Sequence, residues 1–268
     1  MDRIDNSAWR TLFYGESVLF AFVDTELLKM ELRFIAERIR QRVRRSSDFA
    51  STAWNPRLVD IPPGERFLVL APHPDDDVIG CGGTILKLLA ARKSVRIVYL
   101  SIQSSRDFSK TERLEEMAES LAILGVKDYS FLAEQFPSES EIVGLLGEEL
   151  SSFKPESVFV PSPVENHDQH LKTFGAYVEL GRKRKAQESA ILYEVWTPLI
   201  PNMIVDVSQF MSKKLEAVAA HKTQTRDLDY GRAVESLDSY RAAMSTLKGY
   251  CEAFLMLSRA DFLRTFRS

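Results

Sequence analysis

Residues 67–84, FLVLAPHPDDDVIGCGGT, decide the fold of this chain. The apolar run 67–71 has the length and composition of a buried strand, and the Pro-His-Pro sequence after it ends the strand. One histidine and three consecutive aspartates then follow, and a glycine-rich turn leads into an expected helix. Polar side chains at the carboxyl end of a buried strand occupy the place where ligands bind in open α/β sheets.

The three aspartates, Asp75, Asp76 and Asp77, need a compensating charge. Adjacent carboxylates raise each other's pKa unless a cation or several N–H donors lie nearby. One aspartate would suffice to cap the following helix, so three beside His73 favour a divalent metal. Imidazole nitrogen with carboxylate oxygen suits zinc, whereas carboxylates alone would suit magnesium.

The overall composition is that of a soluble globular protein, with 45% hydrophobic and 27% charged residues in 268. A formal charge of −3 gives no general attraction to nucleic acid. The two cysteines, Cys81 and Cys251, exclude a disulfide framework and a cysteine zinc cage. No secretory signal is recognisable, and the early apolar run 18–23 is too short to span a bilayer. We therefore expect a cytoplasmic protein without a transmembrane segment.

The N-terminal region differs from the rest of the chain. Residues 8–45 carry apolar side chains at three-to-four spacing and become rich in arginine toward their end, which predicts a helix. Residues 46–63 contain three prolines and are expected to be a linker. We expect residues 1–60 to be a helical extension with its linker, residues 61–268 to be the main domain, and the extension to offer a contact surface for a homo-oligomer.

From residue 67 onward, short apolar runs alternate with segments of helical periodicity. The expected strands are 67–71, 95–100, 129–132, 157–160 and 191–196. The expected helices are 81–92, 111–124, 139–153, 168–181 and 209–222. This alternation predicts an α/β fold, a Rossmann-like, mostly parallel sheet with helices on both faces.

A second polar loop, PSPVENHDQH at residues 161–170, follows the expected strand 157–160. His167 and His170 are three residues apart, so at the start of a helix both imidazoles point to one side. Three of the four histidines of the chain lie in these two loops: His73 in the first, and His167 and His170 in the second. Their occurrence at two strand ends favours one shared metal site.

These segments resemble the LmbE-like, or PIG-L-like, zinc-dependent N-acetylglucosaminyl deacetylases. The resemblance extends from about residue 67 to about residue 224. It depends on the first loop with its glycines, on the His167-x-x-His170 pair, and on two weaker segments, 113–125 and Lys214 with 221–224. It implies a metal hydrolase that removes an N-acetyl group from an N-acetylglucosamine-type conjugate.

The resemblance also assigns roles to individual residues. It implies that His73, Asp76 and His170 hold one zinc ion, or another divalent metal, and leave a position open as a catalytic zinc requires. It implies that Asp75 is the general base that deprotonates the attacking water. It further implies that His167, as an imidazolium, stabilises the oxyanion or protonates the leaving amine.

Arg113 stands where the family has an arginine that contacts the substrate. The other interpretation is a solvated helix arginine paired with a neighbouring glutamate, because Leu114, Met117, Leu121 and Leu124 form the expected core face.

Two positions depart from the family pattern. Asp77 replaces a glutamate, and Gln169 replaces an aspartate before the last histidine. Loss of a carboxylate that supports a metal ligand costs about 10–100-fold in affinity or activity. Asp168 is the nearest substitute, but it points about 100° away on a helix.

Three alternatives remain open from the residues. Asp75-x-Asp77 after a strand also fits a haloacid-dehalogenase-like magnesium phosphatase. Gly80-x-Gly82-Gly83 weakly resembles a dinucleotide-binding turn. A sugar-binding relative without catalysis is favoured by Gln169 alone.

Substrate preference is expected to depend on loops 101–110 and 196–203. Trp196 is either a stacking wall for a sugar ring or a buried strand-end side chain, and burial is the expected state.

Overall fold

The computed structural model describes residues 56–102, 109–184, 187–226 and 228–265. The predicted N-terminal helix and most of the predicted linker lie outside these residues. So does most of loop 101–110.

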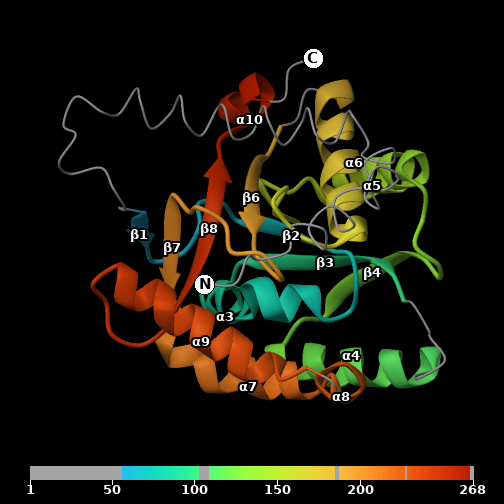
Figure 1. Cartoon of the computed structure of the whole chain (residues 1–268). Helices are drawn as coiled ribbons and strands as arrows, with labels where there is room; N and C mark the ends of the chain where they lie inside the picture. The colour runs from blue at the N-terminus through green and yellow to red at the C-terminus, as the bar shows by residue number, and fades with distance from the viewer. Residues whose placement is uncertain (1–55, 103–108, 185–186, 227, 266–268) are drawn as a thin grey trace, which may run out of the picture.

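An eight-stranded sheet forms the centre of the described chain, in the order β1-β7-β8-β6-β5-β2-β3-β4 (Figure 1). The strands are β1 Arg57–Val59, β2 Arg66–Ala71, β3 Ser94–Ser101, β4 Asp128–Ala133, β5 Ser157–Pro161, β6 Ser189–Tyr193, β7 Met203–Asp206 and β8 Cys251–Leu257. Strands β2 to β6 pair in parallel, whereas β8 runs antiparallel to both β6 and β7. The predicted α/β fold with a mostly parallel sheet is confirmed.

Helices cover both faces of the sheet (Figure 1). The helices are α3 Asp76–Ala90, α4 Lys110–Leu124, α5 Glu139–Phe153, α6 Asp168–Arg184, α7 Met211–Ala219, α8 Lys222–Thr225, α9 Tyr230–Met244 and α10 Arg259–Thr265. Helices α3, α4, α7 and α9 lie on one side of the sheet, and α5, α6 and α10 lie on the other.

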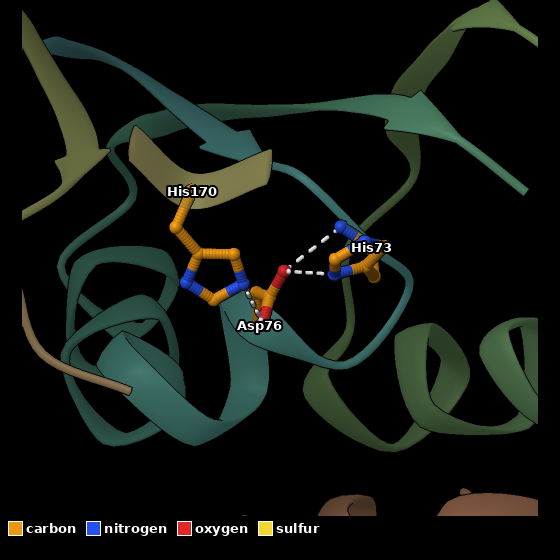
Figure 2. Close-up of side chains that lie close together, drawn as sticks. All are labelled: His73, Asp76 and His170. Carbon is orange, nitrogen blue, oxygen red and sulfur yellow. Dashed lines mark hydrogen bonds and ion pairs between the residues drawn. The ribbon is translucent and has the colours of Figure 1, made fainter. Parts of the chain in front are cut away.

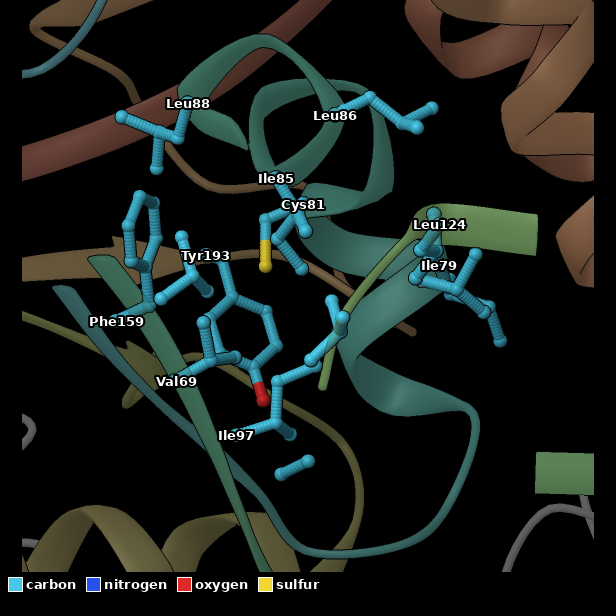
Figure 3. Close-up of a cluster of buried hydrophobic side chains, with 14 of the residues drawn as sticks. Val69, Ile79, Cys81, Ile85, Leu86, Leu88, Ile97, Leu124, Phe159 and Tyr193 are labelled. Carbon is cyan, nitrogen blue, oxygen red and sulfur yellow. The ribbon is translucent and has the colours of Figure 1, made fainter. Parts of the chain in front are cut away.

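Strand β2 explains why the sheet is covered on both faces. Leu68 and Leu70 belong to the core cluster beneath α5 and α6. Phe67, Val69 and Ala71 belong to the opposite cluster, which includes residues of α3, α4 and α7. Side chains of a strand alternate between faces, so a run that is apolar at every position must be buried on both. Figure 3 shows the second cluster, in which Val69 packs near Ile97 and Phe159.

Helix α3 begins earlier than predicted, at Asp76 instead of residue 81. Its backbone departs from helical geometry at Cys81 (φ −151°, ψ 20°). A Cβ atom at Gly80 would lie 2.3 Å from Cδ2 of Tyr193, so only glycine lets the first turn of α3 approach the end of β6. Asp76 and Asp77 therefore lie in the first turn of a helix and not in a loop.

Other boundaries also correct the sequence predictions. Residues 57–59, assigned to the linker, form β1 and pair in parallel with β7. The strand predicted at 191–196 is observed at 189–193. The helix predicted at 209–222 is a 3₁₀ turn, then α7, with α8 beginning at Lys222. Across the described parts of the chain, no helix is both long and apolar enough to cross a membrane.

Candidate metal centre

His73, Asp76 and His170 meet at the carboxyl ends of β2 and β5. His73 follows β2, Asp76 is the first residue of α3, and His170 lies in the first turn of α6. One nitrogen or oxygen atom from each lies within 4.8 Å of the others. Figure 2 shows the two imidazoles on either side of the carboxylate. The two loops that the sequence assigned to one site therefore do lie together.

Each oxygen of Asp76 faces one imidazole. Asp76 Oδ2 accepts a 2.8 Å hydrogen bond from the backbone N–H of His73 and lies 3.1 Å from His73 Nδ1. Asp76 Oδ1 lies 3.3 Å from His170 Nε2. The carboxylate is thus held between two ring nitrogens, in an arrangement that needs positive charge.

The pKa values of Asp76 and of the two imidazoles are shifted in the directions that favour their charged forms. Burial opposes charge on Asp76, but His170 and His73 outweigh it and hold the pKa of Asp76 below its usual range. Burial likewise opposes charge on His170, yet Asp76 and Glu165 raise its pKa to about 10. The pKa of His73 is also raised, because Asp76 and Asp75 outweigh its burial. Without another cation, the site therefore attracts protons to both imidazoles.

Glu165 supports His170, a role that the sequence did not reveal. Its side chain is fully buried, and Oε2 lies 3.4 Å from His170 Nδ1. The Glu165 carboxylate also accepts backbone N–H hydrogen bonds from residues 195–197 (2.8–3.4 Å). A carboxylate at the second nitrogen of a histidine fixes the ring and its tautomer, as in many metal sites. The only sequence signal was a glutamate four residues after an apolar strand.

Gln169 supports His73. Its side-chain oxygen Oε1 contacts Nε2 of His73, the ring nitrogen turned away from Asp76. The substitution of the family's aspartate thus keeps an acceptor at this position and loses only its charge. Asp168 does not replace that charge at the site, because it is exposed and pairs with Lys172 at 2.5 Å.

The donor set fits a divalent metal. His170 is completely buried, and neither of its ring nitrogens makes a hydrogen bond to any residue that the structure describes. Buried polar atoms in folded proteins are nearly always hydrogen-bonded or bound to an ion. Two imidazole nitrogens with one carboxylate are a three-ligand set that suits zinc and leaves coordination positions open.

Asp75 and Arg113 lie beside this cluster. Asp75 is 7% exposed, and its Oδ1 lies 3.8 Å from Arg113 Nη2. Burial raises the pKa of Asp75, although Arg113 opposes this shift. Arg113 is 3% exposed, so the interpretation of a solvated helix arginine is wrong. The buried stripe of α4 includes position 113, and the guanidinium points into the site.

His167 completes the group of histidines. Its ring centroid lies 5.0 Å from that of His73 and 4.8 Å from that of His170. Partial burial and the two neighbouring imidazoles lower the pKa of His167. The backbone N–H of Gln169 donates to its Nδ1 at 3.3 Å. The neutral ring with its proton on Nε2 is therefore favoured over the imidazolium expected from the sequence.

Asp77 is buried and is not among the three candidate ligands. The Tyr99 hydroxyl donates to its Oδ2 at 3.1 Å. Burial, opposed in part by this bond, raises the pKa of Asp77 to about 7. Asp77 thus ties α3 to β3.

Comparison with known proteins agrees with this geometry. Residues 68–180, which contain both loops, match the family described as PIG-L, GlcNAc-PI de-N-acetylase. Residues 68–180 are therefore similar to a PIG-L family domain. The resemblance to LmbE-like and PIG-L-like proteins is thereby confirmed, and the matched range includes His73, Asp76 and His170.

Several proteins of known name or structure are similar to part of this chain. A diacetylchitobiose deacetylase of Thermococcus kodakarensis is 28% identical over 189 residues, 60% of this chain and 70% of the relative. A conserved protein of Thermus thermophilus has a similar structure, with a TM-score of 0.63 and 27% identity over 72% of this chain and 94% of that one. An N,N'-diacetylchitobiose deacetylase of Pyrococcus horikoshii, in complex with an inhibitor, shares the fold at 24% identity (TM-score 0.64; 74% and 85% coverage).

Proposed function

We propose that this protein is a metal-dependent amide hydrolase that removes the N-acetyl group from an N-acetylglucosamine-type conjugate. The observation that carries the proposal is the placement of Asp76 between His73 and His170 within a PIG-L domain. The deacetylase name of the Thermococcus kodakarensis relative supports the choice of reaction.

In this proposal His73, Asp76 and His170 hold one zinc ion, or another divalent metal, in each chain. Glu165 faces Nδ1 of His170 at 3.4 Å and favours the proton on that nitrogen, which leaves Nε2 unprotonated toward Asp76. Gln169 accepts the Nε2 proton of His73, which leaves Nδ1 unprotonated toward the same carboxylate. When bound, the metal polarises the amide carbonyl and makes water a better nucleophile near neutral pH.

Asp75 is the proposed general base. It lies next to the metal ligands and is buried, and its raised pKa brings proton transfer closer to neutral pH, where a general base works best. Its carboxylate takes a proton from the attacking water and returns it to the amine that leaves. Arg113 fixes this carboxylate from the other side. A contact between Arg113 and the substrate stays a prediction.

His167 is proposed to stabilise the oxygen of the amide as negative charge develops on it. Because Nδ1 accepts a hydrogen bond from Gln169, Nε2 carries the proton and is free to donate. A neutral imidazole donates a hydrogen bond without the cost of protonation beside His73 and His170.

The alternatives receive less support. A haloacid-dehalogenase-like phosphatase would hold magnesium with oxygen ligands, but two imidazoles face the candidate site here. A sugar-binding relative without catalysis was suggested by Gln169, which instead supports His73. The helical extension, a homo-oligomer formed through it and a cytoplasmic location stay predictions.

The direct test is release of acetate from N,N'-diacetylchitobiose and from N-acetylglucosaminides by the zinc-loaded protein. We expect turnover by the wild type and none above background after Asp75→Asn and His170→Ala. Turnover that persists in His170→Ala would contradict the assignment of the site. If the wild type releases no acetate but hydrolyses a phosphate monoester with magnesium, the phosphatase alternative is correct.

A further inference from the structure

A cavity of about 320 Å³ lies beside the metal centre, between α3, α9 and the loop after β6. Its apolar lining includes Ile79, Trp196, Pro198, Leu228, Tyr230 and Leu237. We propose that this cavity binds an apolar chain of the substrate. The inference deepens the proposed function and rests on it.

The cavity is close to the metal centre on two sides. Ile79 follows Asp76 by one turn of α3, which is about 5 Å along the helix. Trp196 donates its backbone N–H at 3.0 Å to Glu165, whose side chain also lies beside His170. The walls of the cavity are therefore connected to Asp76 through one turn of α3 and to His170 through Glu165.

Acidic side chains at the cavity are already paired within the protein. Glu194 is held by Arg241, with distances of 3.0 and 2.5 Å. Asp238 and Glu252 both contact Lys214, at 2.8 and 2.7 Å. The Asp229 side chain accepts the backbone N–H of Arg232 at the start of α9. The carboxylates with these partners are engaged, so the surface that a ligand meets is mainly apolar.

The mouth of the cavity exposes large apolar side chains. Trp196 is 46% exposed and Leu228 is 48% exposed, and both line the cavity. The Trp196 ring meets that of Tyr230 edge-on at 5.7 Å. Burial of Trp196, the expectation from sequence, is therefore wrong. Clustered apolar side chains around a hollow are typical of a binding site for an apolar group.

An amino-sugar conjugate can supply such a group from two sources. The acetamido group is on the carbon next to the anomeric carbon, so a chain on the anomeric oxygen begins only a few bonds from the reacting amide. A longer N-acyl group also begins at the reacting carbonyl. Both sources offer the same chemistry, an alkyl chain, and the experiment separates them.

The test uses two series of ligands with the full-length, zinc-loaded protein. One series contains the methyl, butyl and hexyl β-glycosides of N-acetylglucosamine. The other contains methyl glycosides with N-acetyl, N-butanoyl and N-hexanoyl groups. Calorimetry measures the Kd of each ligand, and product release measures kcat/KM. We expect one series to gain up to about fourfold in affinity for each buried methylene.

Ala233→Phe fills the cavity from α9, and Ala243→Phe is the matched control on the same helix outside the lining. We expect the gain with chain length to disappear in Ala233→Phe and to persist in Ala243→Phe. Equal affinity along both series, or equal gains in both variants, would overturn the inference.

The two proposals fail in different ways. Turnover of the methyl glycoside without any gain from longer chains would leave the reaction intact and overturn the apolar site. A gain in affinity that Ala233→Phe abolishes, without product release, would support the apolar site and contradict the reaction.

Discussion

Two buried groups of charged side chains lie along helix α3, and they differ in how their charges are satisfied. In the cluster of Lys214, Asp238 and Glu252, the ammonium Nζ lies 2.8 Å from Asp238 and 2.7 Å from Glu252. Glu252 also accepts the backbone N–H groups of Gly83 and Thr84, both at 2.7 Å. Every charge in this cluster has a partner within the chain.

The metal centre at the start of α3 is different. His170 is as fully buried as Lys214, at 0% exposure, yet its ring nitrogens make no hydrogen bond to the described residues. Asp76 meets ring nitrogens that must be protonated or bound to a cation. The comparison teaches that burial alone does not identify function. The cluster that contains its own cation stabilises the fold, whereas the one in which imidazoles face carboxylates at 3.3 and 3.4 Å without a hydrogen bond at His170 is suited to a bound cation.

The largest expected effect is on catalysis. Asp75→Asn should lower kcat by about 10²–10⁴-fold, because the amide cannot accept the proton of the attacking water. The variant should keep its bound zinc, since Asp75 is not among the three ligands. Asp168→Asn is the matched control, as this aspartate at the start of α6 has a side chain that is 69% exposed. A wild-type kcat for Asp75→Asn, measured as acetate release, would remove Asp75 from the mechanism.

A substitution in the cluster of Lys214, Asp238 and Glu252 should lower stability and leave metal binding unchanged. Lys214→Met leaves two buried carboxylates without their cation, and this should lower the free energy of unfolding by about 3–5 kcal/mol. Urea denaturation measures the loss. Lys222→Met is the control, because the Lys222 side chain is 70% exposed, and it should leave stability unchanged. Folded Lys214→Met should still bind zinc; if it does not, the two clusters are not separate.

A smaller effect, on zinc affinity, is expected at Glu165, which lies beside His170. Glu165→Gln removes the charge beside His170 Nδ1 and should weaken zinc binding by about 10–100-fold. A competition titration with a zinc chelator measures this change. Glu179→Gln, at a half-buried position on α6 that pairs with Lys183, should bind zinc like the wild type. Unchanged affinity in Glu165→Gln would mean that the three backbone hydrogen bonds are the sole purpose of Glu165.

The smallest effect is expected at Gln169. Gln169→Ala removes the acceptor at His73 Nε2 and should weaken zinc binding by about tenfold, since Asp76 still holds the other side of the ring. Gln169→Asp keeps an acceptor and should bind zinc at least as tightly as the wild type. A larger loss in Gln169→Asp than in Gln169→Ala would show that a carboxylate here disturbs the site.

Much of the fold was predictable because the central strands are apolar at nearly every position. Strands β2, β3 and β5 were found within one residue at each end for this reason. Strands β1 and β7 are only 3 and 4 residues long, and a pattern so short does not identify a strand. The antiparallel direction of β8 depends on its neighbours β6 and β7, which periodicity does not reveal.

Within the site, residues at strand ends were easier to predict than residues on helices. His73, Asp76 and His170 were grouped because two polar loops follow parallel strands, and the structure brings them together. Arg113 was placed off the core face that Leu114 and the apolar residues after it were expected to form, yet α4 buries it in one stripe with Met117, Leu121 and Leu124. The sequence contains the spacing of that stripe. Only the packed structure shows that the stripe ends at the polar site beside Asp75.

The measurement that tests this account most directly is the metal content of the purified protein, beside that of His170→Ala. We expect about one zinc per chain in the wild type and none in the variant, with the helical circular dichroism of the two proteins equal. His221→Ala, which removes the one histidine outside the site, should keep its zinc. No transition metal in the wild type, or equal zinc in the wild type and His170→Ala, would contradict a metal centre at His73, Asp76 and His170.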